Sequence, residues 1–208
     1  MKNAKQQHPL PRRAPVLALP NALLFPNALL PLFIFEPRYR AMLDWSLRHH
    51  RMFCIALIRR GKSEWSTPTD LHQIAGLGLI RACVKRKDGT AQLILQGLSR
   101  VEFTGFSDEH SYLMAGLREV PVTTAGDAEA AALSALVLDL CAQHRATGQG
   151  IPEALDEQLA QVRDPGLLSD LVAHTLVRDP YRRQSVLEAG NIAARLRTLI
   201  HHLREELP

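Results

Sequence analysis

The chain has 208 residues, of which 46% are hydrophobic and 22% are charged, so it can bury the core of one large domain or two small ones but cannot hold two enzymes. Its formal net charge of +4 comes from residues 1–13, which contain four basic and no acidic residues and leave 21 of each sign elsewhere. The charge therefore predicts a disordered basic arm over residues 1–13 and does not by itself indicate nucleic-acid binding.

An uncharged stretch over residues 14–35 follows the arm, and a signal peptide or membrane helix has this arrangement. Four prolines interrupt the stretch: Pro15, Pro20, Pro26 and Pro31. Because each proline inside a helix costs roughly 3 kcal/mol, we expect no continuous helix here and no membrane partner. The three cysteines are too few for a disulfide framework, which favours a reduced, cytoplasmic protein.

Residues 14–122 read as short strands with one inserted helix. Glu36 and Pro37 open that helix, because proline suits a first turn and apolar residues then recur at helical spacing up to Leu47. A buried strand is predicted over Met52–Ile58. Further strands are predicted over residues 74–84, 91–98, 101–106 and 112–122, the first two joined at an Asp88-Gly89 hairpin turn. This pattern predicts a small closed or half-closed barrel.

Residues 123–208 read as an α-helical subdomain. An apolar stripe runs from Ala130 to Leu140, and Asp164 and Asp179 each stand before a proline, as helix-capping carboxylates do. The last helix carries a second stripe: Ile192, Leu196, Leu199, Ile200 and Leu203. We expect the other helices to cover this stripe, although an uncovered one would permit a dimer. The chain is thus predicted to be an α+β protein.

The most specific motif is a string of apolar residues and prolines over residues 19–39. It reads L-P-x-x-x-L-F-P-x-x-x-L-P-L-x-I-F-E-P-R-Y as a family pattern, and this chain matches at Leu19, Pro20, Leu24, Phe25, Pro26, Leu30, Pro31, Leu32, Ile34, Phe35, Glu36, Pro37, Arg38 and Tyr39. The string resembles the start of the Lon protease amino-terminal domain. A second match is the glycine and hairpin pattern that ends in L-x-L-x-G-x-x-R at Arg100. The resemblance implies a PUA-like barrel followed by a helical bundle.

Catalytic and nucleotide-binding motifs are not found in the sequence. Residues 56–63 fit a relaxed phosphate-loop pattern, but the supposed loop is a predicted strand and no helix follows it. Full-length Lon proteases use a Ser–Lys dyad and an ATPase, and neither motif occurs here. We therefore expect a stand-alone substrate-binding domain without enzymatic activity, cofactor or nucleotide.

Three pairs of residues suggest a metal-binding site: His49-His50, His201-His202 and Cys141-x-x-His144. Zinc sites use three or four converging ligands, whereas adjacent histidines on a helix point about 100° apart. We expect solvated helix ends at these positions and no metal site.

Two groups of residues are candidates for binding. Phe33, Phe35, Glu36, Arg38 and Tyr39 could line a groove for extended peptide. A structural interpretation competes with this one, in which Glu36 caps the helix, Arg38 pairs with a carboxylate and Tyr39 packs beneath. The second group could contact phosphate: Arg81, Lys85, Arg86 and Arg100.

Two functional hypotheses follow. The first, implied by the resemblance, is a non-catalytic module that binds unfolded or degron-bearing polypeptide, or a protein partner. Peptide would add along a sheet edge or lie between the barrel and the helices. The alternative is RNA binding by a PUA-like barrel, with steep salt dependence. No motif supports an enzyme acting on a small molecule.

Overall fold

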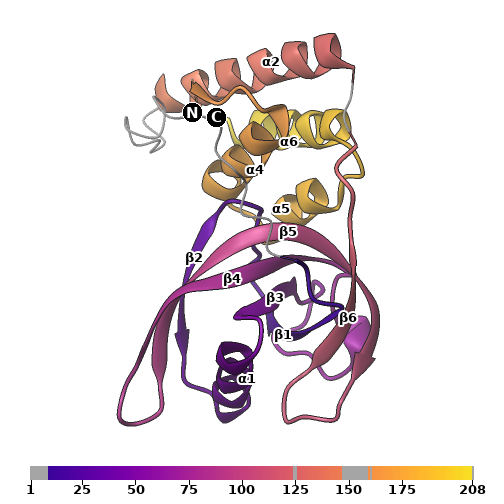
Figure 1. The fold of residues 1–208 in the computed structure, drawn as a ribbon. Helices are drawn as coiled ribbons and strands as arrows, with labels where there is room; N and C mark the ends of the chain where they lie inside the picture. Colours follow the sequence, from indigo (N-terminus) through magenta and orange to yellow (C-terminus); the bar gives the residue numbers. More distant parts are fainter. Residues whose placement is uncertain (1–8, 124–125, 147–158, 160, 208) are drawn as a thin grey trace.

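The computed structural model describes residues 9–123, 126–146, 159 and 161–207. The strands, one longer helix and the short helical turn Pro68–Asp70 form the lower part of the molecule in Figure 1, and the other described helices stack above them. The predicted α+β class is confirmed. The predicted arm lies largely outside the described residues, and Arg13 already belongs to the first strand.

Six strands form a mixed sheet within the described residues. They are β1 (Arg13–Leu19), β2 (Leu29–Ile34), β3 (Met52–Leu57), β4 (Ile74–Lys85), β5 (Ala91–Ser107) and β6 (Met114–Glu119). The strand order is β2-β5-β4-β3-β1-β6, and β6 also pairs with β5. Five strands therefore close into a ring, and β2 lies outside it, paired with the first half of β5.

One strand replaces two that the sequence predicted. We expected a break between residues 98 and 101, but β5 is a continuous strand of 17 residues. Ser99 and Arg100 keep their pairing with β4, opposite Leu77 and Gly76, and a register shift between Leu77 and Gly78 absorbs the irregularity. The prediction was wrong because a bulge bends a strand without ending it.

Two glycines explain how the proline-rich segment lies against the sheet. A Cβ on Gly76 would stand 1.9 Å from the Leu24 carbonyl oxygen, and one on Gly97 would stand 1.9 Å from that of Phe25. Only glycine permits so close an approach of two backbones. Leu24 and Phe25 consequently reach the core and are fully buried.

Helix α1 (Pro37–Arg48) begins where the sequence predicted, with Pro37 in its first turn. Tyr39, Met42 and Leu43 form its buried face. Glu36 occupies the N-cap position, but its side chain makes no capping hydrogen bond, so this detail of the structural interpretation was wrong. Figure 1 shows α1 between the two long hairpins of the sheet.

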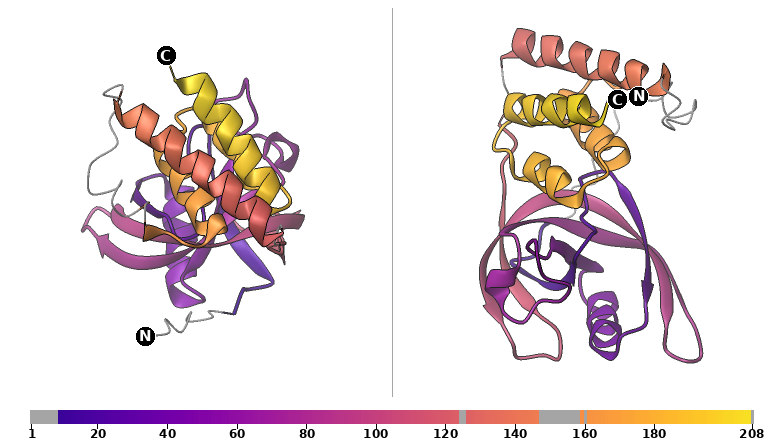
Figure 2. Two further views of the ribbon diagram at one scale, coloured as in Figure 1. Left: turned by 90° about the horizontal axis from the view of Figure 1, so that it is seen from above. Right: turned by 180° about the vertical axis from the view of Figure 1, so that it is seen from behind.

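The upper helices are α2 (Asp127–Ala146), α4 (Pro165–Leu176), α5 (Pro180–Glu188) and α6 (Ile192–Glu206). The Asp164 carboxylate accepts hydrogen bonds from the backbone of α4, and the Asp179 carboxylate does the same for α5, which confirms both caps. The predicted stripe on α6 is buried against α2, α4 and α5, and Figure 2 shows α2 and α6 running side by side. None of the described helices combines the length and apolar character needed to cross a membrane.

The sheet and the upper helices share one hydrophobic cluster, to which Phe25 of the proline-rich segment and Leu168 of α4 both belong. Arg100 lies inside this junction with 3% of its surface exposed. Its Nη1 donates to Asp170 Oδ2 at 3.0 Å, and its Nε donates to the Leu187 carbonyl oxygen at 3.1 Å. Arg100 is thus a structural residue, which corrects its place among the phosphate-binding candidates.

Candidate functional site

Strand β2 presents an apolar face to solvent. Side chains alternate along a strand, and here Leu30, Leu32 and Ile34 face the core. Leu29, Pro31 and Phe33 face outward and are exposed. The same alternation that fills the core therefore leaves a second apolar row on the surface.

The pairing register brings outward residues of two further strands beside this row. Phe33 stands opposite Gln92 of β5, which in turn stands opposite Val84 of β4. Pro31, Ile94 and Ala82 form the next row. These residues line a shallow groove of about 460 Å³, which we call the outer groove: Pro31, Phe33, Ala82, Val84, Gln92 and Ile94.

Exposed large side chains surround the outer groove. The exposed fractions are 56% for Leu29, 49% for Phe33, 58% for Phe35 and 66% for Val84. The Phe33 and Phe35 rings stack with centroids 5.8 Å apart and planes 24° from parallel. A contiguous exposed apolar surface of this kind marks a binding site or an aggregation hazard in a soluble domain.

Basic residues flank the outer groove at the hairpin between β4 and β5. The Arg86 guanidinium lies 5.8 Å from the centre of the Phe33 ring, within the range of a cation–π contact. Arg81 and Lys87 are exposed, whereas Lys85 is paired with Asp44 of α1. Three of the four phosphate-contact candidates, Arg81, Lys85 and Arg86, thus lie on this hairpin.

The remaining peptide-contact candidates lie at the start of α1. Arg38 forms an ion pair with Glu36 at 2.9 Å, and its guanidinium lies 4.7 Å from the Tyr39 ring centre. Tyr39 is buried, and its hydroxyl donates to the Ala18 carbonyl oxygen at 3.3 Å. Burial raises the pKa of this hydroxyl. Tyr39 is not accessible to a peptide, so the structural interpretation fits this residue better.

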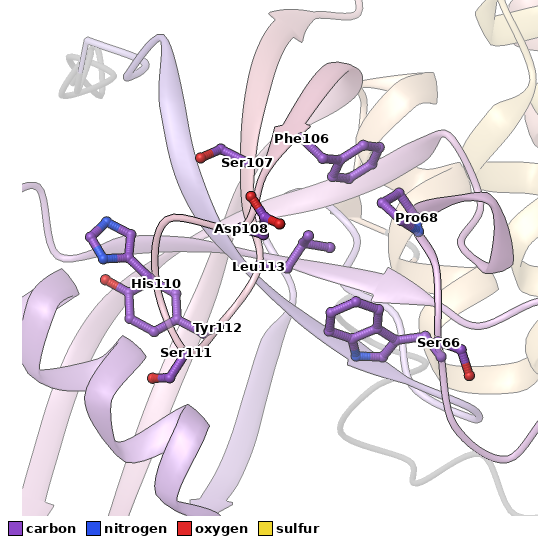
Figure 3. A pocket seen from close by; sticks show the side chains of 10 residues that line it. Ser66, Pro68, Phe106, Ser107, Asp108, His110, Ser111, Tyr112 and Leu113 are labelled. Carbon is purple, nitrogen blue, oxygen red and sulfur yellow. The ribbon is translucent and has the colours of Figure 1, made fainter.

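A second cavity of about 420 Å³ lies between the loop after β3 and the turn joining β5 and β6 (Figure 3). Trp65, Phe106 and Tyr112 supply aromatic walls, and the His110 ring stacks on Tyr112 at 4.9 Å. Sequence reasoning missed this cavity, because about forty residues separate its two segments and no spacing pattern links them. Asp108 and His110 add polar groups to the same lining.

The relaxed phosphate-loop pattern does not form a phosphate site. Residues 56 and 57 end β3, and Lys62 is engaged by Asp70. Hydrogen bonds from the Lys62 side chain and from the Ser66 and Thr67 backbone lower the pKa of Asp70, so the carboxylate holds this loop. The sequence predicted no helix directly after residues 56–63, but a three-residue 3-10 helix forms at Pro68–Asp70. One helical turn of this length is too short to supply the helix N-terminus that holds phosphate in a phosphate loop.

Comparison with known proteins supports one family. The family model of the ATP-dependent protease La (LON) substrate-binding domain matches residues 13–205. Lon protease of Desulfosudis oleivorans is 26% identical over 200 residues, which are 95% of this chain and 24% of that protein. Lon protease 2 of Syntrophobacter fumaroxidans is 28% identical over 198 residues, covering 95% of this chain and 25% of its own. The chain spans about a quarter of the length of these relatives.

Solved structures share the fold. The N-terminal domain of Lon protease from the Mycobacterium avium complex has a TM-score of 0.72 and 18% identity, covering 94% of this chain and all (100%) of that one. A Lon N-terminal domain protein from Xanthomonas campestris has a TM-score of 0.64 and 17% identity, covering 91% and 97%. Because the family model covers most of the sequence and the fold agrees, this chain belongs to the Lon substrate-binding domain family.

Proposed function

We propose that this chain is a non-catalytic module that binds segments of unfolded polypeptide in the outer groove. The observation that carries the proposal is the exposed apolar surface on β2, β4 and β5, centred on the stacked Phe33 and Phe35 rings. Membership of a substrate-binding family supports it. An unfolded segment exposes apolar side chains, and these gain free energy by leaving water.

The outer groove suits side-chain capture better than strand addition. One edge of β2 is paired with β5, and among the described residues no strand pairs with its other edge. Pro31 stands in the middle of β2 and has no N–H to donate, so an added strand would find an interrupted ladder there. The junction between the sheet and the helices is filled by the shared core, so peptide binding there is less favourable. We therefore place the peptide on the face of β2.

The expected affinity is modest. Covering the exposed halves of four apolar side chains, about 80 Å² each, contributes about 2 kcal/mol per side chain at about 25 cal/mol per Å² of apolar surface. Loss of translational and conformational freedom on binding offsets much of this gain. Dissociation constants from about 10 μM to 1 mM are consistent with these magnitudes. Weak contacts that tolerate many sequences suit a module that samples unfolded chains.

The test is fluorescence anisotropy with a labelled, permanently unfolded, apolar-rich polypeptide. Replacing both Phe33 and Phe35 by serine should weaken binding at least tenfold, because the centre of the outer groove is lost. The matched control is Val122→Ser, which removes an apolar side chain of 59% exposure from the segment after β6. Equal binding by all three proteins would refute the outer groove as the site. Loss of binding in the control as well would indicate non-specific binding to exposed apolar side chains.

RNA binding stays the alternative, since Arg81, Arg86 and Lys87 are exposed on one hairpin. It predicts that affinity for a labelled single-stranded RNA falls steeply as the salt concentration rises. Arg86→Gln should reduce the slope of the logarithm of affinity against the logarithm of salt concentration. Peptide binding through apolar contacts predicts little change with salt. Comparing the two probes at low and moderate salt separates the hypotheses.

We also infer a cytoplasmic location. Cys54 is buried, Cys83 is half-buried, and neither forms a disulfide, which suits a reducing compartment. The proteolytic and ATP-driven activities of full-length Lon relatives are not carried over to this chain, because it matches only about a quarter of their length.

A further inference from the structure

The last turns of α6 bring together three side chains that can bind a metal ion. His201, His202 and Glu205 each offer one ligand atom, and these atoms lie within 4.8 Å of one another. The two imidazole ring centres are 5.3 Å apart. The group lies on the upper helices, away from the outer groove on β2, β4 and β5.

Hydrogen bonding favours one protonation pattern for His202. The Ser185 hydroxyl lies 2.8 Å from the Arg182 carbonyl oxygen and 2.8 Å from His202 Nε2. A hydroxyl has a single hydrogen, so a Ser185 that donates to the carbonyl accepts from Nε2. We therefore assign the proton of the neutral ring to Nε2 and a lone pair to Nδ1.

That lone pair has no donor to accept from. His202 Nδ1 is buried without a hydrogen-bond partner, and the Glu205 carboxylate oxygen Oε2 lies 3.7 Å from it. Two acceptors thus face each other. A cation between them would satisfy the Nδ1 lone pair and would take the place of the Arg182 guanidinium on Glu205 Oε2, because an imidazole lone pair and a carboxylate oxygen are both metal ligands.

The separations fit a small cation better than direct hydrogen bonds. His201 Nε2 lies 3.5 Å from Glu205 Oε1, and His202 Nδ1 lies 3.7 Å from Glu205 Oε2. Two ligands bound tetrahedrally to zinc stand about 3.4 Å apart, from bond lengths of about 2.0–2.2 Å. Small side-chain rotations would close the remaining gap.

We propose that His201, His202 and Glu205 bind one divalent transition-metal ion of the zinc class. Two imidazoles and a carboxylate supply three ligands, and water would complete the coordination. Ser185 of α5 would act as the outer partner that holds the His202 ring. Arg182 opposes binding, since its guanidinium lies 3.2 Å from Glu205 Oε2 and competes for the carboxylate.

From the sequence we expected no metal site at this doublet, because adjacent helical residues diverge by about 100°. The structure shows that both histidine side chains approach the same carboxylate, from positions three and four residues before it. Glu205 therefore supplies the third ligand that the doublet alone lacks.

The test is isothermal titration calorimetry of ZnCl₂ binding to untagged, chelator-treated full-length protein. A second titration with CoCl₂ follows the visible absorption of the bound ion. We expect one ion per chain. Glu205→Gln and His201→Ala should each weaken binding at least tenfold, and both side chains are sufficiently exposed for the fold to survive the change. Ser185→Ala should weaken binding about 10- to 100-fold without removing a ligand.

Two further variants sharpen the test. The double variant His49→Ala/His50→Ala removes a matched histidine doublet at the end of α1 and should bind zinc as the parent does. Arg182→Ala should tighten binding severalfold by freeing Glu205. Bound zinc should raise the melting temperature of the parent but not of Glu205→Gln. Unchanged zinc affinity in Glu205→Gln and His201→Ala, or loss of binding in the His49/His50 variant, would overturn the proposal.

Discussion

Replacing Asp170 by alanine should destabilise the protein more than any other single change at the junction of sheet and helices. Asp170 and Arg100 form an ion pair whose side chains are 5% and 2% exposed. Arg195 of α6 is also buried. Burial, and then the neighbouring Arg100 charge, lower the pKa of Arg195 to about 10, and the Asp170 carboxylate opposes this shift. One carboxylate thus balances two buried guanidinium groups.

The magnitude follows from this arrangement. Removing one partner of a buried ion pair costs about 3–5 kcal/mol, because the other charge stays uncompensated. Asp170→Ala leaves two uncompensated charges, so its cost should lie at the upper end of this range. That cost is a large share of the total free energy of unfolding of a domain, which is about 5–15 kcal/mol. Arg100→Met should cost less, since Asp170 still has Arg195. The double variant Arg100→Met/Asp170→Leu should cost less than the sum of its parts.

The assay is urea unfolding followed by far-ultraviolet circular dichroism, with the free energy of unfolding extrapolated to zero urea. The control is Glu102→Gln, which breaks the exposed pair between Glu102 and Arg118 and should cost at most about 1 kcal/mol. If Asp170→Ala costs no more than this control, the carboxylate is not the counter-charge of the buried guanidinium groups. If Arg100→Met costs more than Asp170→Ala, the idea that Asp170 balances two guanidinium groups is refuted.

Two other predictions concern the core. Gly97→Ala should destabilise the fold by about 1–3 kcal/mol in the same unfolding assay, because the new Cβ would collide with the Phe25 carbonyl oxygen. The control is Gly105→Ala, which has open space around its Cβ and should cost no more than about 1 kcal/mol. Burial, and then the Arg183 charge, lower the pKa of His174 below its ordinary value of 6.5, so the unfolded chain binds more protons than the folded one as pH falls below 6.5. Stability should therefore decline below pH 6.5, and His174→Gln should flatten that decline; an unchanged profile would contradict it.

The candidate site was predictable only in part. Phe33 and Phe35 were named from the sequence, and both border the outer groove. Tyr39 was named with them, yet it is buried on the apolar face of α1 with Met42 and Leu43, as the competing structural interpretation expected. Val84 and Ile94 complete the outer groove but were not named. Only the pairing register places them beside β2, and register depends on bulges that the sequence did not reveal.

Arg100 is a second residue whose role could not be predicted from the sequence. A basic residue near a basic hairpin suggests a phosphate contact, and sequence alone has no means of pairing it with an aspartate 70 residues later. The metal candidate on α6 depends likewise on side-chain geometry, since Ser185 of α5 orients His202 across two helices.

The sequence by itself determined the family, the α+β class and the positions of most elements, because prolines, capping carboxylates and apolar spacing act within a few residues of one another. Asp164 and Asp179 begin helices, and Pro37 begins α1, through contacts that are purely local. Only the tertiary structure decided that β2 lies outside the ring with an exposed apolar face, and that Arg100 is buried. Those outcomes depend on contacts between segments far apart in the chain, which local patterns do not encode.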